Sequence, residues 1–117
     1  MHLKVKELIR QFETGATRDT DEGKLHIVGY YSPLVVKRFS EYMLKHEIQS
    51  DGNAREPGNW KKGISKDAYL DSLIRHVLDL WLEHEIGGGS REGVEEALCG
   101  VIFNGQGYLH EVLKEKV

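Results

Sequence analysis

The chain of 117 residues has the length of a single domain, which excludes two independent hydrophobic cores. Its formal charge of −3 disfavours duplex nucleic acid as a partner, because that binding depends on neutralising phosphates. The single cysteine, Cys99, excludes an intrachain disulfide, and we expect neither a signal peptide nor a membrane-spanning segment, because long apolar runs are absent. The composition therefore predicts one cytoplasmic domain over residues 1–117.

The N-terminal third of the chain combines one short helical pattern with two other segments. Four apolar residues recur at the spacing of one helix face, namely Val5, Leu8, Ile9 and Phe12. They predict a short helix over residues 5–12. Residues 14–24 are rich in Gly, Thr and Asp, which is typical of a loop. The apolar run 25–31 is strand-like but isolated, so we expect either an extended loop or part of a small sheet between copies.

Three longer helical patterns follow. The pair Ser32-Pro33 is typical of a helix start, and the apolar spacing after it predicts a helix over 33–48. A second pattern, ended by a run of three glycines, predicts a helix over 66–86, and the last predicts a helix over 91–115. The short loop between the last two helices predicts an antiparallel hairpin. The expected fold is therefore all-α, with about four helices, a C-terminal antiparallel helix hairpin and long ordered loops.

Three glycines interrupt the last helical pattern, at Gly100, Gly105 and Gly107. Each costs a helix about 1 kcal/mol relative to alanine. They indicate either close packing against another helix or a local bend that shapes a site.

Polar side chains on the two hairpin helices are candidates for a metal site. His76, Asp79 and Glu83 share one helix face, and Glu96 lies on the following helix. Asn104 falls on an apolar stripe and is expected to point toward the core. Helix bundles build sites for hard cations such as Mg²⁺ or Mn²⁺ from such residues on facing helices. The same carboxylates also fit a solvated helix face and favourable first-turn acids.

Two loops have the composition of nucleotide-binding segments. Residues 15–24 combine glycines and hydroxyls with the cations Arg18 and Lys24, and residues 58–63 combine Asn59 and Trp60 with two lysines. An indole can stack on a base, an amide can bind the edge of the base, and cations can hold phosphates. The alternative is a structural loop in which Trp60 fills part of the core.

A series of short motifs resembles one phage family in order and spacing. The motifs are residues 12–24, Ser32-Pro33-Leu34, Arg38-Phe39, residues 59–64, Arg75-His76, Ala97-Leu98-Cys99 and Asn104. They resemble the N-terminal domain of phage dATP/dGTP diphosphohydrolases, over a stretch from about Phe12 to Leu113. The resemblance implies a protein of bacteriophage or prophage in a bacterial host cell. It also implies a likeness to the all-helical MazG-type pyrophosphohydrolases, which are oligomers with sites between subunits, so we expect a homo-oligomer.

The function implied by this resemblance is the hydrolysis of purine (deoxy)nucleoside triphosphates to monophosphate and pyrophosphate, with Mg²⁺ or Mn²⁺ as cofactor. The expected catalytic residues and metal ligands are Asp79, Glu83 and Glu96. The expected substrate-binding residues are Arg18, Lys24, Asn59, Trp60, Lys61, Lys62, Arg75, His76 and Asn104.

The sequence departs from the family in its carboxylates. Glu95 and Glu96 stand where relatives often carry histidines, and the paired ExxE and ExxD motifs of MazG enzymes are incomplete. Intact nucleotide loops with an incomplete carboxylate set favour an alternative, a non-catalytic phage binder that sequesters a nucleotide-derived immune signal of the host. An interaction subunit without a ligand is a third hypothesis.

Overall fold

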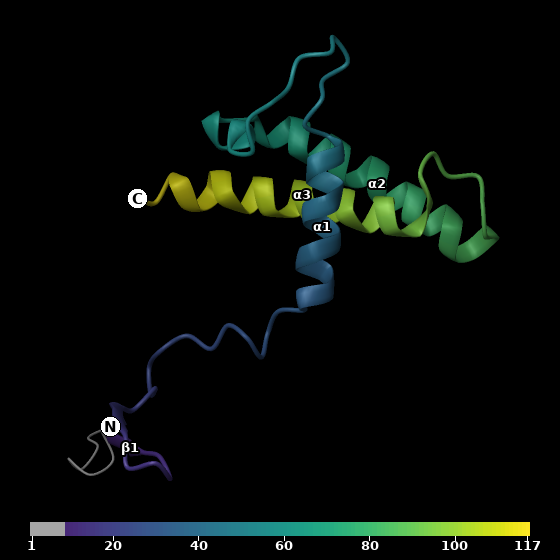
Figure 1. Cartoon of the computed structure of the whole chain (residues 1–117). Helices are drawn as coiled ribbons and strands as arrows, with labels where there is room; N and C mark the ends of the chain where they lie inside the picture. The colour runs from purple at the N-terminus through teal and green to yellow at the C-terminus, as the bar shows by residue number, and fades with distance from the viewer. Residues whose placement is uncertain (1–8) are drawn as a thin grey trace. The chain divides into compact units, whose positions relative to one another are not determined.

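The structure, a computed structural model, describes residues 9–117. The chain divides into two compact units, one ending at Ser32 and the other spanning Pro33–Val117 (Figure 1). Within the described residues, none of the helices combines the length and the apolar character that are needed to cross a bilayer.

The first unit contains a small antiparallel sheet. Strand β1 (Ile9–Gln11) pairs with β2 (Thr17–Asp19), with Ile9 opposite Asp19. Between the strands the amide of Phe12 donates to the carbonyl of Ala16 at 2.9 Å, and Gly15 adopts a φ of 89°. The left-handed conformation suits glycine, so this turn directs the chain back on itself.

The helix predicted over residues 5–12 is wrong for Ile9–Gln11, which form β1, and residues 5–8 lie outside the described part of the chain. The spacing of the apolar residues is compatible with a helix, but pairing with β2, further along the chain, gives residues 9–11 a strand conformation. Residues 25–31 form no strand and contain a turn in which Tyr30 donates its amide to the carbonyl of Ile27 at 3.0 Å.

The second unit contains three α-helices and one short 3-10 helix. They are α1 (Pro33–Lys45), η2 (Asn59–Lys62), α2 (Lys66–Ile86) and α3 (Gly93–Lys114). The protein is therefore mostly helical, as predicted, but the described residues hold three α-helices and a two-stranded sheet rather than a strictly all-α set of four helices.

Neighbouring residues determine both ends of α2, whereas a contact with a residue further along the chain determines the end of α1. Ser65 accepts a hydrogen bond from the amide of Ala68, and Gly87 closes the helix with a φ of 79°, so α2 has the predicted bounds. Helix α1 ends at Lys45, three residues before the predicted end, because Ile48 instead forms a β-bridge with Ala54.

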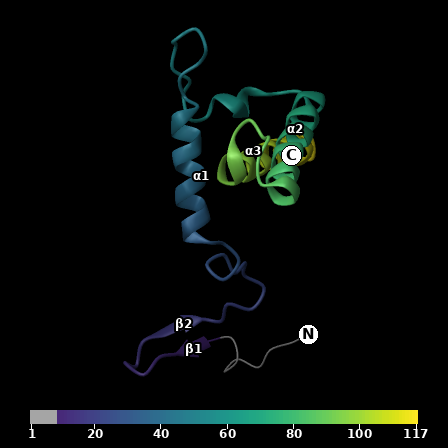
Figure 2. The ribbon, with the colours of Figure 1, turned by 90° about the vertical axis from the view of Figure 1, so that its right-hand side faces the viewer.

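Helices α2 and α3 form the predicted antiparallel hairpin, and α3 lies between α1 and α2 (Figures 1 and 2). Two glycines of α3 allow its close approach to α2. A Cβ at Gly100 would overlap the ring of His76, and a Cβ at Gly107 would overlap the ring of Tyr69. The close-packing interpretation is thus confirmed for these two glycines, whereas a Cβ at Gly105 would meet nothing within 4 Å.

The core of the second unit is small. Its buried apolar or aromatic residues are Tyr42, Tyr69, Ala97 and Cys99, and Asp79 and Asn104 are buried polar residues. Burial raises the pKa of the Tyr69 phenol, whose hydroxyl has no hydrogen-bond partner among residues 9–117.

We expect Tyr69→Phe to stabilise the protein by about 1 kcal/mol, because an unpaired buried hydroxyl carries a desolvation penalty that phenylalanine lacks. Urea unfolding followed by circular dichroism measures the change in the free energy of unfolding. A loss of stability instead would mean that the hydroxyl makes a hydrogen bond in solution.

Candidate functional site

A cavity of about 710 Å³ lies within the second unit, bounded by α1, the segment after it, η2 and the hairpin. Cavities of this size are typical of small-molecule sites. Its aromatic lining comes from Phe39, Tyr42, Trp60 and Phe103. Its charged or titratable lining comes from His46, Glu47, Arg55, Glu56 and His76.

Four of the residues predicted to bind substrate line this cavity, namely Asn59, Trp60, His76 and Asn104. Trp60 is half-buried, and its ring packs edge-on against Phe103 and His110 with centroid distances of 6.2 and 4.9 Å. Trp60 therefore lines the cavity and also packs against α3. A stacking surface for a base and a packing role in the core, the two interpretations of Trp60 from the sequence, are therefore compatible.

The side chains of Asn104 and His76 both contact Gly100 of α3. Asn104 is 4% exposed, as expected for a core-facing amide, and its Nδ2 donates to the carbonyl of Gly100 at 2.7 Å. The ring of His76 lies against the same glycine. The absence of a side chain at Gly100 therefore allows an imidazole and an amide to reach the same wall of the cavity.

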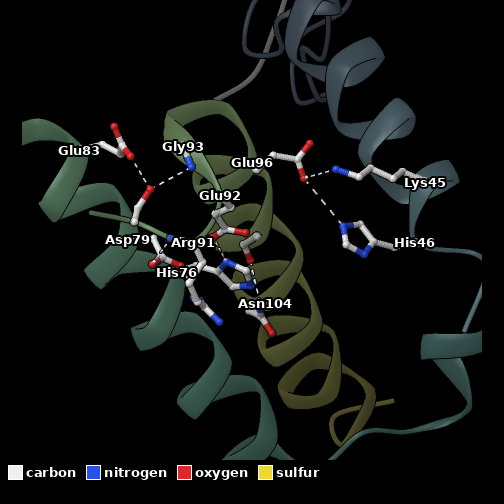
Figure 3. Close-up of polar contacts among 12 residues, drawn as sticks. Lys45, His46, His76, Asp79, Glu83, Arg91, Glu92, Gly93, Glu96 and Asn104 are labelled. Atoms are coloured by element: carbon white, nitrogen blue, oxygen red, sulfur yellow. Dashed lines mark hydrogen bonds and ion pairs between the residues drawn. The ribbon is translucent and has the colours of Figure 1, made fainter. Parts of the chain in front are cut away.

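His76 also belongs to the one group of possible metal ligands found in residues 9–117, which contains His76, Asp79 and Glu92. Their candidate ligand atoms lie within 4.8 Å of one another, and His76 Nδ1 is 2.5 Å from Glu92 Oε1 (Figure 3). Glu92 was not predicted from the sequence, because it precedes α3 and only the 87–92 loop brings it back to α2.

Asp79 has a second partner in Arg91. Its Oδ2 accepts hydrogen bonds from Arg91 Nε at 2.9 Å and Nη2 at 2.5 Å, and Oδ1 lies 3.4 Å from the Arg91 amide. The Arg91 guanidinium holds the pKa of the buried Asp79 carboxyl below its usual range. The negative charge of Asp79 is therefore already compensated within the chain.

The other two predicted metal ligands have separate partners (Figure 3). Glu83 accepts a hydrogen bond from Ser90 Oγ, which itself accepts from the amide of Gly93 at 2.9 Å. Ser90 thus connects Glu83, a residue of α2, to the first residue of α3, and Glu83 is not a member of the His76 group.

Glu96 faces α1. Its carboxylate lies 3.1 Å from Arg38 Nη2, 3.4 Å from Lys45 Nζ and 3.9 Å from His46 Nε2. Burial by itself would raise the pKa of Glu96, but hydrogen bonds from Arg38 and Lys45 outweigh burial and lower it. Glu96 therefore links α3 to α1.

These contacts bear on the expected cofactor. Mg²⁺ prefers an all-oxygen ligand set, whereas the group that assembles includes an imidazole and lies against the Arg91 guanidinium. The residues present therefore do not form the expected magnesium site of Asp79, Glu83 and Glu96.

The predicted phosphate-binding cations are spread over the chain. Lys61, Lys62 and Arg75 are exposed and are not part of the cavity lining. Arg18 lies in β2 opposite Arg10, and Lys24 lies in a turn, both within the first unit. The cavity instead contains Arg55, which sequence reasoning missed because it lies in a loop without a recognisable motif.

Comparisons of the chain with family models, with curated proteins and with solved structures found no match.

Proposed function

We propose that the second unit binds a purine nucleoside triphosphate in the cavity between α1, η2 and the hairpin. The observation that carries this proposal is the convergence of Asn59, Trp60, His76 and Asn104 on one cavity of nucleotide size. Loop composition indicated Asn59 and Trp60 as nucleotide contacts, and the family resemblance added His76 and Asn104. The four residues come from three different elements.

The residues that line the cavity fall into two groups, one suited to a purine base and one suited to phosphate. The indole of Trp60 offers a stacking surface, and the amides of Asn59 and Asn104 offer donors and acceptors for a purine edge. Arg55 and His46 are the groups for phosphate, whereas Glu47 and Glu56 oppose it. We therefore expect the nucleoside part to contribute most of the affinity.

Hydrolysis to monophosphate and pyrophosphate is the second candidate function. It is favoured by one observation, that His76 both lines the cavity and belongs to the group with Asp79 and Glu92. Binding without hydrolysis, as in the sequestration of a nucleotide-derived immune signal, is favoured by the arginines that already neutralise Asp79 and Glu96. The geometry supports binding more directly than it supports hydrolysis.

One experiment separates these functions. The protein is incubated with each purine and pyrimidine nucleoside triphosphate, and with the matching nucleosides, in Mg²⁺, in Mn²⁺ or in a chelator. Melting curves report binding, and chromatography reports monophosphate and pyrophosphate. We expect purines to raise the melting temperature more than pyrimidines do. Products in the presence of metal would establish the hydrolase, shifts without products would establish the binder, and no shift with any purine would refute the proposal.

We expect Trp60→Ala to weaken the binding of the purine that gives the largest shift at least tenfold, because stacking of a base on an aromatic ring contributes about 1–3 kcal/mol. Calorimetric titration measures the dissociation constant. Trp60→Phe is the matched control, since it keeps an aromatic ring and should retain most of the affinity. Equal affinities for Trp60→Ala and wild type, with both proteins folded, would exclude stacking on Trp60.

A further inference from the structure

One wall of the cavity carries two polar side chains whose orientation is fixed by contacts within the chain. Asn104 of α3 and His76 of α2 both line the cavity, and both lie against Gly100. Each already makes one hydrogen bond to a group that can only accept (Figure 3). The atom that each leaves for a ligand follows from that bond. We call these three residues the Gly100 wall.

Asn104 presents an acceptor to the cavity. Its Nδ2 donates to the carbonyl of Gly100 at 2.7 Å, and the amide cannot turn over without losing this bond, because its oxygen cannot donate. Its Oδ1 accepts no hydrogen bond from residues 9–117. The one enclosed side-chain polar atom without a partner in these residues is the hydroxyl of Tyr69, so Asn104 Oδ1 is open to the cavity.

His76 presents a second acceptor. Its Nδ1 lies 2.5 Å from Glu92 Oε1, and an ionised carboxylate only accepts, so Nδ1 carries a proton. In the neutral ring Nε2 then has no proton and offers its lone pair. Within residues 9–117 this atom has no hydrogen-bond partner, and it is not among the enclosed atoms. Glu92 therefore fixes which ring nitrogen acts as the acceptor.

The Gly100 wall is unsuited to phosphate. Phosphate oxygens would face the lone pairs of Asn104 and His76, and the carboxylate of Glu92 bonds the far side of the ring. The cationic lining residue, Arg55, comes from the segment between α1 and η2. The part of a nucleotide that fits this wall is therefore an uncharged edge that donates hydrogen bonds.

The stacking surface lies beside this wall. Trp60 packs edge-on against Phe103 with a centroid distance of 6.2 Å, and Phe103 directly precedes Asn104 in α3. A base stacked on Trp60 is therefore close enough to α3 for its edge, rather than its sugar, to meet the Gly100 wall.

We propose that the Gly100 wall binds the Watson–Crick edge of guanine and selects guanine over adenine nucleotides, an inference that rests on the proposed function. Guanine presents two adjacent donors on this edge, N1–H and the N2 amino group, which match two acceptors. Adenine presents its N6 amino group beside the lone pair of N1, so one acceptor of the wall would face another acceptor. A site built from fixed polar groups rejects a ligand that leaves one of them unpaired.

The test compares nucleotides that differ only in these donors. Calorimetric titration at about pH 8, where a neutral imidazole is favoured, gives the dissociation constants of GTP, inosine triphosphate and ATP in the same Mg²⁺ concentration. We expect GTP to bind at least tenfold more tightly than ATP, and inosine triphosphate, which keeps N1–H but lacks the amino group, to lie between them. We expect dGTP to bind as tightly as GTP.

Two variants test the residues themselves. Asn104→Leu removes one acceptor and should reduce the preference for GTP over ATP to less than threefold. Glu92→Gln replaces the carboxylate by an amide that can donate to Nδ1 as well as accept from it, so either form of the His76 ring is allowed and the preference should also fall. Glu95→Gln is the matched control, because this side chain is 75% exposed and lies outside the cavity lining, and it should keep the wild-type preference.

Equal binding of GTP and ATP by the wild type would overturn this inference and leave the proposed function standing, whereas failure of every purine to bind would overturn both. A preference for GTP over dGTP larger than that over ATP would assign the wall to sugar hydroxyls and also overturn it. So would an undiminished preference in Glu92→Gln. If Asn104→Leu does not fold, Glu92→Gln decides, because partial unfolding lowers the binding of both nucleotides equally and leaves their ratio unchanged.

Discussion

Gly107→Ala is expected to destabilise the protein by about 2 kcal/mol or more, because the added Cβ would overlap the ring of Tyr69. Tyr69 is 1% exposed and fully enclosed, so the ring cannot move without a shift of the hairpin helices. The gain in helix propensity of about 1 kcal/mol on replacing glycine offsets only part of this cost. Urea unfolding followed by circular dichroism measures the change.

Gly105→Ala is the matched control for this prediction. It lies two residues away on the same helix, and a Cβ there would meet no atom of the chain within 4 Å. It should therefore stabilise the helix by about 0.5–1 kcal/mol. Equal effects of the two substitutions would show that Gly107 is not a point of close approach.

Arg91→Leu is expected to lower the melting temperature by several degrees at neutral pH, because the buried carboxylate of Asp79 loses its guanidinium partner. In the wild type the folded-state pKa of Asp79 is lowered, so its contribution to stability is present above its unfolded pKa of about 3.9. That contribution is lost as the pH falls through the folded-state pKa.

The difference in melting temperature between wild type and Arg91→Leu should therefore shrink as the pH is lowered below about 4. Melting curves from neutral pH to this range measure it. Arg91→Lys keeps the positive charge but not the paired donors of the guanidinium. Its melting temperature at neutral pH should lie between those of the wild type and Arg91→Leu. A difference that stays constant with pH would assign the effect to packing of the arginine stem rather than to the ion pair.

Local sequence determined the elements whose ends are encoded by neighbouring residues. Helix α2 has the predicted bounds because Ser65 caps its start and Gly87 adopts the left-handed conformation at its end. The hairpin followed from the short loop after α2, and the burial of Asn104 followed from its apolar stripe. Each of these predictions depends on residues within one or two helical turns of one another.

Tertiary structure decided the features that join residues far apart in the chain. The apolar spacing of Ile9 and Phe12 is compatible with a helix, and only pairing with Thr17–Asp19 makes residues 9–11 a strand. Spacing on α2 grouped Asp79 with Glu83, but the loop before α3 brings Glu92 and Arg91 to Asp79 and His76 and gives Glu83 a different partner.

Glu96 is the clearest example of a residue whose partners could not be predicted from the sequence. Its position in the first turn of α3 could be predicted from the sequence, whereas its partners Arg38 and Lys45 come from α1, more than fifty residues earlier. Helical periodicity fixes which side chains share a face, because the rotation per residue is constant. It does not fix which helix meets that face, and the charge, partners and chemistry of these carboxylates depend on that packing.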